Sequence, residues 1–363
     1  MKLPDTDCPI PAATHPDGDR ADAHSVAWMR RFALCSSETE RDRLAQTGCG
    51  MLVARIVPHA SPQTLQILSD FFVWNVSFDD EYCDEGPLSR RPGDLAWVLS
   101  LIQRTIEIPE LALNTQDRYA AALHDIRQRL DTHATAAQMS QWLAAMRGWF
   151  LAEVWKAGNV AAQRMPSLDE YATLRLYSGG GLVFPVLATI AEGYSVPVDV
   201  LEARRVRALT EMAASLATWA ADIASYEKEI AREEGGHNLI SVIQHEHRCG
   251  PDRAGALAAA MYRQVMQLFL RSREALVSDG SPALRRYIDS LGHYLRAAFD
   301  WCHASERYPQ AGGPEAAPTA PAEAPLQASS IASIAWWWMH DPAGATTQDT
   351  AAPHAPARTG VPA

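Results

Sequence analysis

The chain has 363 residues, of which 47% are hydrophobic, and it carries a formal net charge of −11. This length is enough to bury one large core or two small ones. An acidic chain without a basic block is a poor match for nucleic acid, and its charge gives no reason to expect binding to an anionic membrane surface.

The six cysteines include no CxxC pair, so neither a zinc site nor a redox motif is expected, and such scattered thiols are typical of a reducing compartment. The N-terminal sequence MKLPDTDCPIP lacks a basic segment followed by an apolar run, which predicts no signal peptide. No run of 18 apolar residues occurs, so we expect no transmembrane helix. These features together predict a cytoplasmic protein.

The predicted elements begin after an N-terminal arm, residues 1–24, that is rich in Pro, Asp and His. From Trp28 to about Tyr308, Ala, Leu, Arg and Glu dominate, and apolar residues recur at intervals of three and four. Turn-forming sequences interrupt this pattern and delimit about ten helices. SLDE, at 167–170, is a capping-box sequence that opens one of them. The fold class expected is therefore all-α, with residues 1–308 as a single domain.

Residues 309–363 are rich in Pro, Ala, Gly and Thr, which predicts a mostly disordered tail because such a segment buries too little to offset its ordering entropy. One island, SSIASIAWWWMHDP at 329–342, interrupts it. Two interpretations stay open for this island: a marginally ordered tail, or a segment that docks on the globular body or on another chain. A homodimer is one assembly that the sequence leaves open.

The first cluster of chemically distinctive residues is FDDEYCDE at 78–85, directly after an apolar helical sequence. It brings the carboxylates of Asp79, Asp80 and Asp84 together, and like charges this close repel unless cations lie between them. Hard cations such as Mg²⁺ prefer carboxylate oxygens and keep waters that a phosphate can replace. Taken alone, the sequence fits either a magnesium site or a solvated acidic turn.

A second polar sequence, ADIASYEKE at 221–229, places Ser225 and Glu229 on one helical face, with Lys228 adjacent. A hydroxyl and a carboxylate suit a second cation site, although a solvated helix with charge pairs has the same composition. RLYSGGG at 175–181 puts three glycines in an apolar helical context, which predicts a break where a ligand or a backbone carbonyl comes close.

Taken together, these motifs resemble those of the bacterial class I terpene synthases, over about residues 8–308. FDDEYCDE stands at the aspartate-rich motif, and ADIASYEKE stands at the Asn-Asp-x-x-Ser-x-x-x-Glu motif. The family's pyrophosphate-sensing arginine, linker, effector position and C-terminal Arg-Tyr pair fall, in that order, on Arg175, Ser178, Gly179, and Arg307 with Tyr308. The resemblance implies a terpene synthase helical bundle around a deep apolar cavity.

The resemblance also implies a cyclase that ionises a linear isoprenoid diphosphate with the help of three Mg²⁺ ions. We expect farnesyl diphosphate and a sesquiterpene product, with geranyl or geranylgeranyl diphosphate as alternatives. The implied metal ligands are Asp79 and Asp84, supported by Asp80, at one lip of the cavity, and Ser225 and Glu229 at the other. The implied diphosphate-binding residues are Arg175, Lys228, Arg307 and Tyr308. The residues nominated for the cavity wall are Val76, Gly179, Phe184, Tyr294 and Trp301, with Asn75 as a polar neighbour.

One position departs from the family pattern, because Ala221 stands where the second metal motif has asparagine. Three explanations stay open: the site binds its metal with an extra water, Asp222 substitutes after a small helix rotation, or the chain is catalytically impaired. Losing one oxygen ligand should weaken metal binding about tenfold or more, roughly 1.4 kcal/mol.

Two other functions compete with the cyclase. A chain-elongating prenyltransferase would need a second DDxxD motif, which ADIAS at 221–225 does not supply. A non-catalytic protein that binds prenyl diphosphates, or a scaffold, is motivated by Ala221 and by the tryptophan-rich tail.

Overall fold

The structure is a computed structural model that describes residues 3–231, 237–305, 307 and 326–345. Within these ranges every regular element is helical and no strand occurs, which confirms the all-α prediction. The α-helices are α1 (Gly18–Arg31), α2 (Glu38–Ala45), α3 (Cys49–Ile56), α4 (Pro62–Phe78), α5 (Pro92–Glu107), α6 (Arg118–Leu130), α7 (Ala136–Ala161), α8 (Leu168–Tyr177), α9 (Val183–Ala191), α10 (Val198–Leu201), α11 (Arg204–Ala231), α12 (Leu239–His247), α13 (Pro251–Asp279), α14 (Pro282–Ala304) and α15 (Pro342–Ala345).

Shorter helical segments lie between them: η1 (Asp5–Asp7), η2 (Asp79–Asp84), η3 (Pro87–Arg90), η4 (Pro109–Leu111), η5 (Ser178–Gly180), η6 (Ala328–Ser330) and η7 (Ala335–His340). The described chain thus has more helices than the roughly ten expected from sequence. Short helices such as α2 and α3, with eight residues each, offer too few turns for a clear periodicity.

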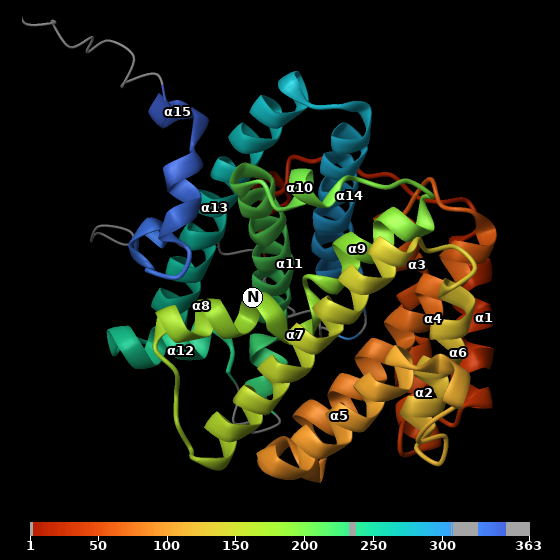
Figure 1. Cartoon of the computed structure of the whole chain (residues 1–363). Coiled ribbons are helices and arrows are strands. Elements are labelled where there is room, and N and C mark those ends of the chain that lie inside the picture. The colour runs from red at the N-terminus through yellow and green to blue at the C-terminus, as the bar shows by residue number, and fades with distance from the viewer. Residues whose placement is uncertain (1–2, 232–236, 306, 308–325, 346–363) are drawn as a thin grey trace, which may run out of the picture.

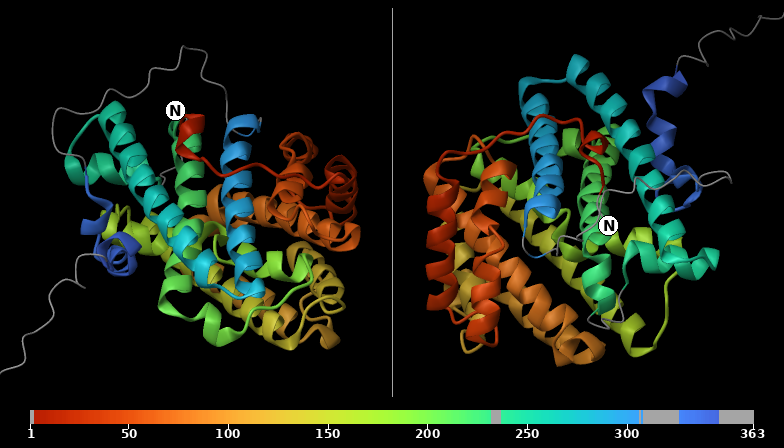
Figure 2. Two further views of the ribbon diagram at one scale, coloured as in Figure 1. Left: turned by 90° about the horizontal axis from the view of Figure 1, so that it is seen from above. Right: turned by 180° about the vertical axis from the view of Figure 1, so that it is seen from behind.

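The bundle has two packed halves that meet around a shared cavity. In Figure 1, α1, α3, α4 and α6 lie on one side, and α11 and α13 lie on the other. Helix α14 packs against both α11 and α3, and α7 packs against α5 and α9. Figure 2 shows the same arrangement from two further directions, with α14 beside α11 in both views.

Local sequence explains where the helices nearest the cavity begin and break. Ser61 caps α4 with its side chain and Pro62 follows at the first position, as helix starts prefer. Ser167 and Glu170 form the predicted capping box of α8. The predicted glycine break is also present, since Gly179 and Gly180 both have a φ of 73° in the short segment between α8 and α9.

The tryptophan-rich segment of the tail docks on the globular body. Trp337 is fully buried, and its indole N–H donates a hydrogen bond of 3.0 Å to Glu211 on α11. Asp341 accepts two hydrogen bonds, of 2.7 and 3.0 Å, from Arg271 on α13. Figure 1 shows this segment in blue alongside α13. Residues 326–345 of the tail therefore dock on the globular body, as one of the two interpretations expected. The rest of the tail, for which disorder was expected, lies outside the described residues.

One stretch of the described chain is long and apolar enough to cross a membrane by length and composition alone, Leu168–Ala191, and 72% of its apolar window is buried inside the bundle. It comprises α8 and α9 with the glycine break between them. All six cysteines are free thiols.

Candidate active site

A single cavity of about 260 Å³ brings the sequence-predicted residues together. Its lining includes every site residue predicted from sequence except Tyr308, which lies outside the described residues. These residues come from α4, η2, α8, η5, α9, α11 and α14 and from the position after α14. Segments that lie far apart in the sequence therefore converge on one space, with the polar groups of the two motifs and the predicted wall residues in the same lining.

The first lip, defined here as Asp79, Asp80 and Asp84, lies where α4 continues into η2. This segment is wound as a π-helix, a wider turn that is frequent at functional sites. Burial, followed by the neighbouring charge of Asp84, raises the pKa of Asp79 well above its ordinary value. Asp79 Oδ1 is buried and has no hydrogen-bond partner among the described residues. The donor set and this orphaned oxygen fit a hard divalent cation.

Two residues of α7 that sequence reasoning missed stand against the first lip. Lys156 Nζ lies 2.7 Å from Asp84 Oδ1 and 2.5 Å from Glu153 Oε2. Burial alone would lower the pKa of Lys156, but the charges of Asp84, Glu153 and Asp79 outweigh it and hold that pKa well above its usual value. Glu153 is fully buried and also accepts a hydrogen bond of 3.1 Å from the backbone N–H of Gly179. Nothing in the local sequence of α7 distinguishes these residues from an ordinary helical charge pair.

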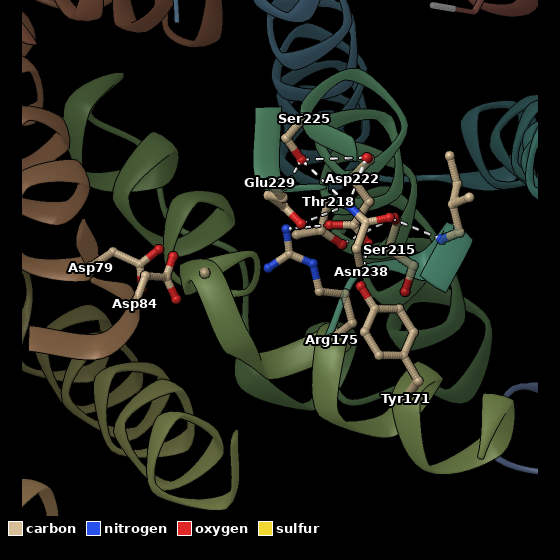
Figure 3. Close-up of polar contacts among 12 residues, drawn as sticks. Asp79, Asp84, Tyr171, Arg175, Ser215, Thr218, Asp222, Ser225, Glu229 and Asn238 are labelled. Atoms are coloured by element: carbon tan, nitrogen blue, oxygen red, sulfur yellow. Dashed lines mark hydrogen bonds and ion pairs between the residues drawn. The ribbon is translucent and has the colours of Figure 1, made fainter. Parts of the chain in front are cut away.

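The second lip, defined here as Ser225 and Glu229, lies on α11. Ser225 Oγ donates a hydrogen bond of 2.5 Å to Glu229 Oε1. Figure 3 shows Asp79 and Asp84 on one side of the site and the second lip on the other. Ala221 also lines the cavity, and its methyl group offers no oxygen donor there.

Asn238 is a further residue that sequence reasoning missed, and it contacts the second lip. Its Nδ2 donates hydrogen bonds of 3.0 Å to Glu229 Oε2 and 2.8 Å to the carbonyl of Asp222. Its Oδ1 accepts from the backbone N–H of Ile240, so Asn238 also caps α12. An asparagine directly before the apolar sequence LISVI is the signal that would have identified the cap, but the contact with Glu229 arises only in three dimensions.

Arg175 reaches the cavity from α8 and pairs with Asp222. Arg175 Nη2 lies 2.8 Å from Asp222 Oδ1, and the hydroxyl of Tyr171 donates to Asp222 Oδ2 (Figure 3). Both carboxylate oxygens of Asp222 are thus engaged, which disfavours its substitution for the missing asparagine in this conformation. Burial raises the pKa of Asp222 to about 6, although Arg175 opposes that rise.

The glycine break brings the backbone close to this arginine. Gly179 has a φ of 73°, a left-handed conformation that favours glycine, and a Cβ there would lie 2.9 Å from Arg175 Nη1, so the guanidinium would have to shift. The Nε of Arg175 is buried without a hydrogen-bond partner among the described residues, which leaves it donor capacity for a ligand. Ser178 is buried beside this glycine at 3% exposure.

The aromatic members of the predicted wall pack against one another. Phe184 and Tyr294 stack with ring centroids 5.7 Å apart. Phe72, which was not predicted, contacts both Phe184 and Trp301 with centroids 5.6 Å away in each case. The Trp301 indole N–H donates to the carbonyl of Thr47 at 2.8 Å, which fixes the orientation of the ring.

The remaining wall residues differ in polarity. Val76 is apolar and 7% exposed. Asn75 is 6% exposed, and its Nδ2 has no hydrogen-bond partner among the described residues, so it adds an unpaired amide nitrogen to these wall residues. Lys228 and Arg307 also line the cavity.

Comparison with known proteins identifies the family to which this chain belongs. A family model described as "Terpene synthase family 2, C-terminal metal binding" matches residues 70–267. The chain is 35% identical to a (+)-(1(10)E,4E,6S,7R)-germacradien-6-ol synthase of Streptomyces pratensis, over 93% of this chain and 96% of the relative. It is 32% identical to a farnesyl-diphosphate-cyclizing (+)-T-muurolol synthase of Streptomyces clavuligerus, over 91% of this chain and 81% of the relative.

A solved structure has the same fold. The crystal structure of SVS_A2, a protein from ancestral sequence reconstruction, matches with a TM-score of 0.81 and 31% identity, over 93% of this chain and 99% of that one. The chain belongs to the bacterial class I terpene synthase family. It is an enzyme of that class, and the description of its family model as metal binding agrees with the oxygen donors at both lips.

Proposed function

We propose that this enzyme ionises and cyclises a linear isoprenoid diphosphate in a Mg²⁺-dependent reaction, with farnesyl diphosphate as the substrate and a sesquiterpene as the product. The observation that carries the proposal is the position of the two lips, which line one cavity together with a group of aromatic and aliphatic side chains. Carboxylates gathered within one lip favour a bound cation, and the aromatic and aliphatic part of the cavity suits a hydrocarbon chain.

Each lip has a proposed role in holding the metals. Asp79 and Asp84, with the support of Asp80, would hold Mg²⁺ at the first lip, and Ser225 and Glu229 would hold it at the second. Bound Mg²⁺ supplies charge that stabilises the leaving diphosphate. We expect three ions in total, by analogy with the family.

The protein's own cations would bind and orient the diphosphate. Arg175 presents a planar guanidinium with spare donor capacity, and such a fork suits phosphate oxygens. Lys228, Arg307 and Tyr308 are assigned the same task. Ser178 and Gly179, at the glycine break beside Arg175, would be the linker and effector residues that present the backbone to the substrate.

The wall would shape the hydrocarbon and exclude water from the cation. Phe184, Tyr294 and Trp301 present aromatic rings, which stabilise a nearby cation by roughly 0.5–2 kcal/mol each. Val76 and the α-carbon of Gly179, which carries no side chain, complete the contour. A dry cavity matters here because water would quench an allylic cation.

A catalytically impaired protein that binds prenyl diphosphates is the second candidate, and Ala221 is the observation that favours it. A missing carboxamide would weaken the second metal site while leaving diphosphate binding in place. The prenyltransferase alternative has no comparable support, because the second lip offers one hydroxyl and one carboxylate in place of a DDxxD motif. A cytoplasmic location and a homodimer stay predictions.

The test pairs the chain with its Ala221→Asn variant. Each is incubated with geranyl, farnesyl and geranylgeranyl diphosphate, in Mg²⁺ or in EDTA, while volatile products and released diphosphate are followed together. Mg²⁺-dependent product from the unmodified chain supports the cyclase and fixes the substrate length. Product from the variant alone supports an impaired metal site. If neither protein forms product although both are folded, the cyclase proposal is contradicted.

A further inference from the structure

Lys156 places a positive charge among the carboxylates of the first lip. Its Nζ is 2.7 Å from Asp84 Oδ1, 2.5 Å from Glu153 Oε2 and 3.8 Å from Asp79 Oδ1. The side chain is only 15% exposed and lines the same cavity. The ammonium therefore occupies the space between the two carboxylates that the proposed function assigns to Mg²⁺.

One ammonium does not balance this cluster. When all three carboxyl groups are ionised, as metal ligands must be, Asp79, Asp84 and Glu153 carry a formal charge of −3, and Lys156 contributes +1, so −2 remains. Asp79 Oδ1 is buried and has no hydrogen-bond partner in the part of the chain that the structure describes, so this oxygen is available to a cation. The cluster is thus suited to a divalent cation, but Lys156 already competes for the oxygens of Asp79 and Asp84.

We propose that Lys156 is an internal counter-cation of the first lip, which holds Asp79 and Asp84 in the metal-free enzyme and is displaced from them when a divalent metal binds. This inference rests on the proposed function only in placing a metal at the first lip. An ammonium and a metal ion repel each other at such short separations, so the two compete for the same oxygens.

Competition has a consequence for the order of binding. The displaced ammonium keeps Glu153 as a partner but loses Asp84, and a diphosphate held in the cavity supplies a second anionic partner in its place. Metal binding at the first lip is therefore coupled to diphosphate binding, and metal alone binds there weakly. Removing the positive charge of Lys156 should strengthen metal binding without diphosphate and reduce the gain that diphosphate brings.

The experiment measures Mn²⁺ binding to the full chain by electron paramagnetic resonance of the free ion, since carboxylate sites accept Mn²⁺ as they do Mg²⁺. Lys156→Met keeps the length of the side chain and removes its charge. We expect it to bind Mn²⁺ about tenfold more tightly than the unmodified chain in the absence of diphosphate. Inorganic diphosphate should then raise the affinity by a smaller factor in this variant than in the unmodified chain.

Three controls separate this effect from a general change of charge or fold. Arg147→Met removes a cation from the same helix, where Arg147 pairs with Glu107 away from the cavity, and should leave Mn²⁺ affinity unchanged. Lys156→Arg retains the charge and should retain weak binding. Adding Asp84→Asn to Lys156→Met should abolish the gain, which assigns it to the first lip.

If Lys156→Met proves hard to fold, Lys156→Gln and the rise in melting temperature on adding Mg²⁺ give the same comparison. Binding by Lys156→Met that is no tighter than that of the unmodified chain would overturn the inference and leave the cyclase proposal standing. Tighter Mn²⁺ binding by Lys156→Met, together with no turnover by the unmodified chain, would support the inference and contradict the cyclase proposal. Failure of every variant to bind Mn²⁺ would count against both.

Discussion

Arg307 forms a two-pronged ion pair with Asp80, with N–O distances of 2.8 and 2.6 Å between residues 227 positions apart in the sequence. Asp80 belongs to the aspartate-rich motif at the end of α4, and Arg307 follows α14. The pair thus joins the end of α4 to the segment after α14 in the lining of the cavity, and it places the charge of Arg307 against the first lip.

This pair predicts that Arg307→Gln lowers catalytic efficiency with the preferred diphosphate by about 10- to 100-fold, because a two-pronged charged contact at the site is lost. The measurement is kcat/KM from released diphosphate. Arg271→Gln is the matched control, since it breaks another two-pronged pair, with Asp341 on the outer face of the bundle. Equal losses in the two variants would attribute the effect to stability and contradict a role at the lip.

Asn238 predicts an effect on metal binding that is separable from helix capping. Asn238→Ser keeps an oxygen that can cap α12 but loses the amide donor to Glu229. We expect stability close to that of the unmodified chain and metal affinity about tenfold weaker, as is usual when a hydrogen-bond partner of a metal ligand is removed. Isothermal titration with Mn²⁺ and diphosphate checks the affinity.

Asn238→Ala removes both interactions and completes the comparison. It should lose the same metal affinity and, in addition, about 1 kcal/mol of stability through the missing cap. Metal affinity that stays unchanged in both variants would show that Asn238 serves only as a cap.

Asp70 predicts how one buried carboxyl changes stability with pH. It is 1% exposed, and it accepts hydrogen bonds from Ser25, Gln66 and Arg129. Burial raises its pKa above the ordinary 3.8, and Arg129 only partly opposes this. Between about pH 4 and the raised pKa, Asp70 therefore binds more protons in the folded chain than in the unfolded chain. Its contribution to stability falls as the pH rises through this range. Above the raised pKa the contribution no longer changes with pH.

Urea unfolding of the chain and of Asp70→Asn between pH 4 and pH 7 tests this sign. The uncharged variant should gain in stability relative to the unmodified chain as the pH rises. A relative gain by the unmodified chain would mean that Arg129 outweighs the burial of Asp70.

Sequence reasoning was strongest where a function depends on residues close together in the chain. FDDEYCDE and SGGG are local motifs, and the helix end and the glycine break that they predict are present in the structure. Lys156 was missed because its contact with Asp84 spans 72 positions and depends on how α7 packs beside η2. Periodicity predicts which face of α7 is buried, but it does not predict which distant carboxylate that face meets.

The tail shows a different limit of sequence reasoning. Three adjacent tryptophans cannot all face one side of a helix, which is why the sequence left docking and disorder open. In the structure these tryptophans lie in the 3-10 helix η7, which buries Trp337 against the globular body and leaves Met339 82% exposed. The apolar surface that receives Trp337 belongs to α11 and is formed by residues far from the tail in sequence.

The docked segment gives the last prediction, which concerns stability. Trp337→Ala removes a fully buried ring and its hydrogen bond to Glu211, so it should lower the free energy of unfolding by about 3–5 kcal/mol. Chemical denaturation measures this loss. Met339→Ala, two positions away and exposed, should change stability by less than about 0.5 kcal/mol.

Catalysis should respond less than stability, because Trp337 contacts α11 several turns before the second lip. We expect kcat of Trp337→Ala at low temperature to stay within about twofold of that of the unmodified chain, with faster inactivation on warming. A large fall in kcat at a temperature where the variant remains folded would instead show that the docked segment holds α11, and with it Ser225 and Glu229, in the position that catalysis requires.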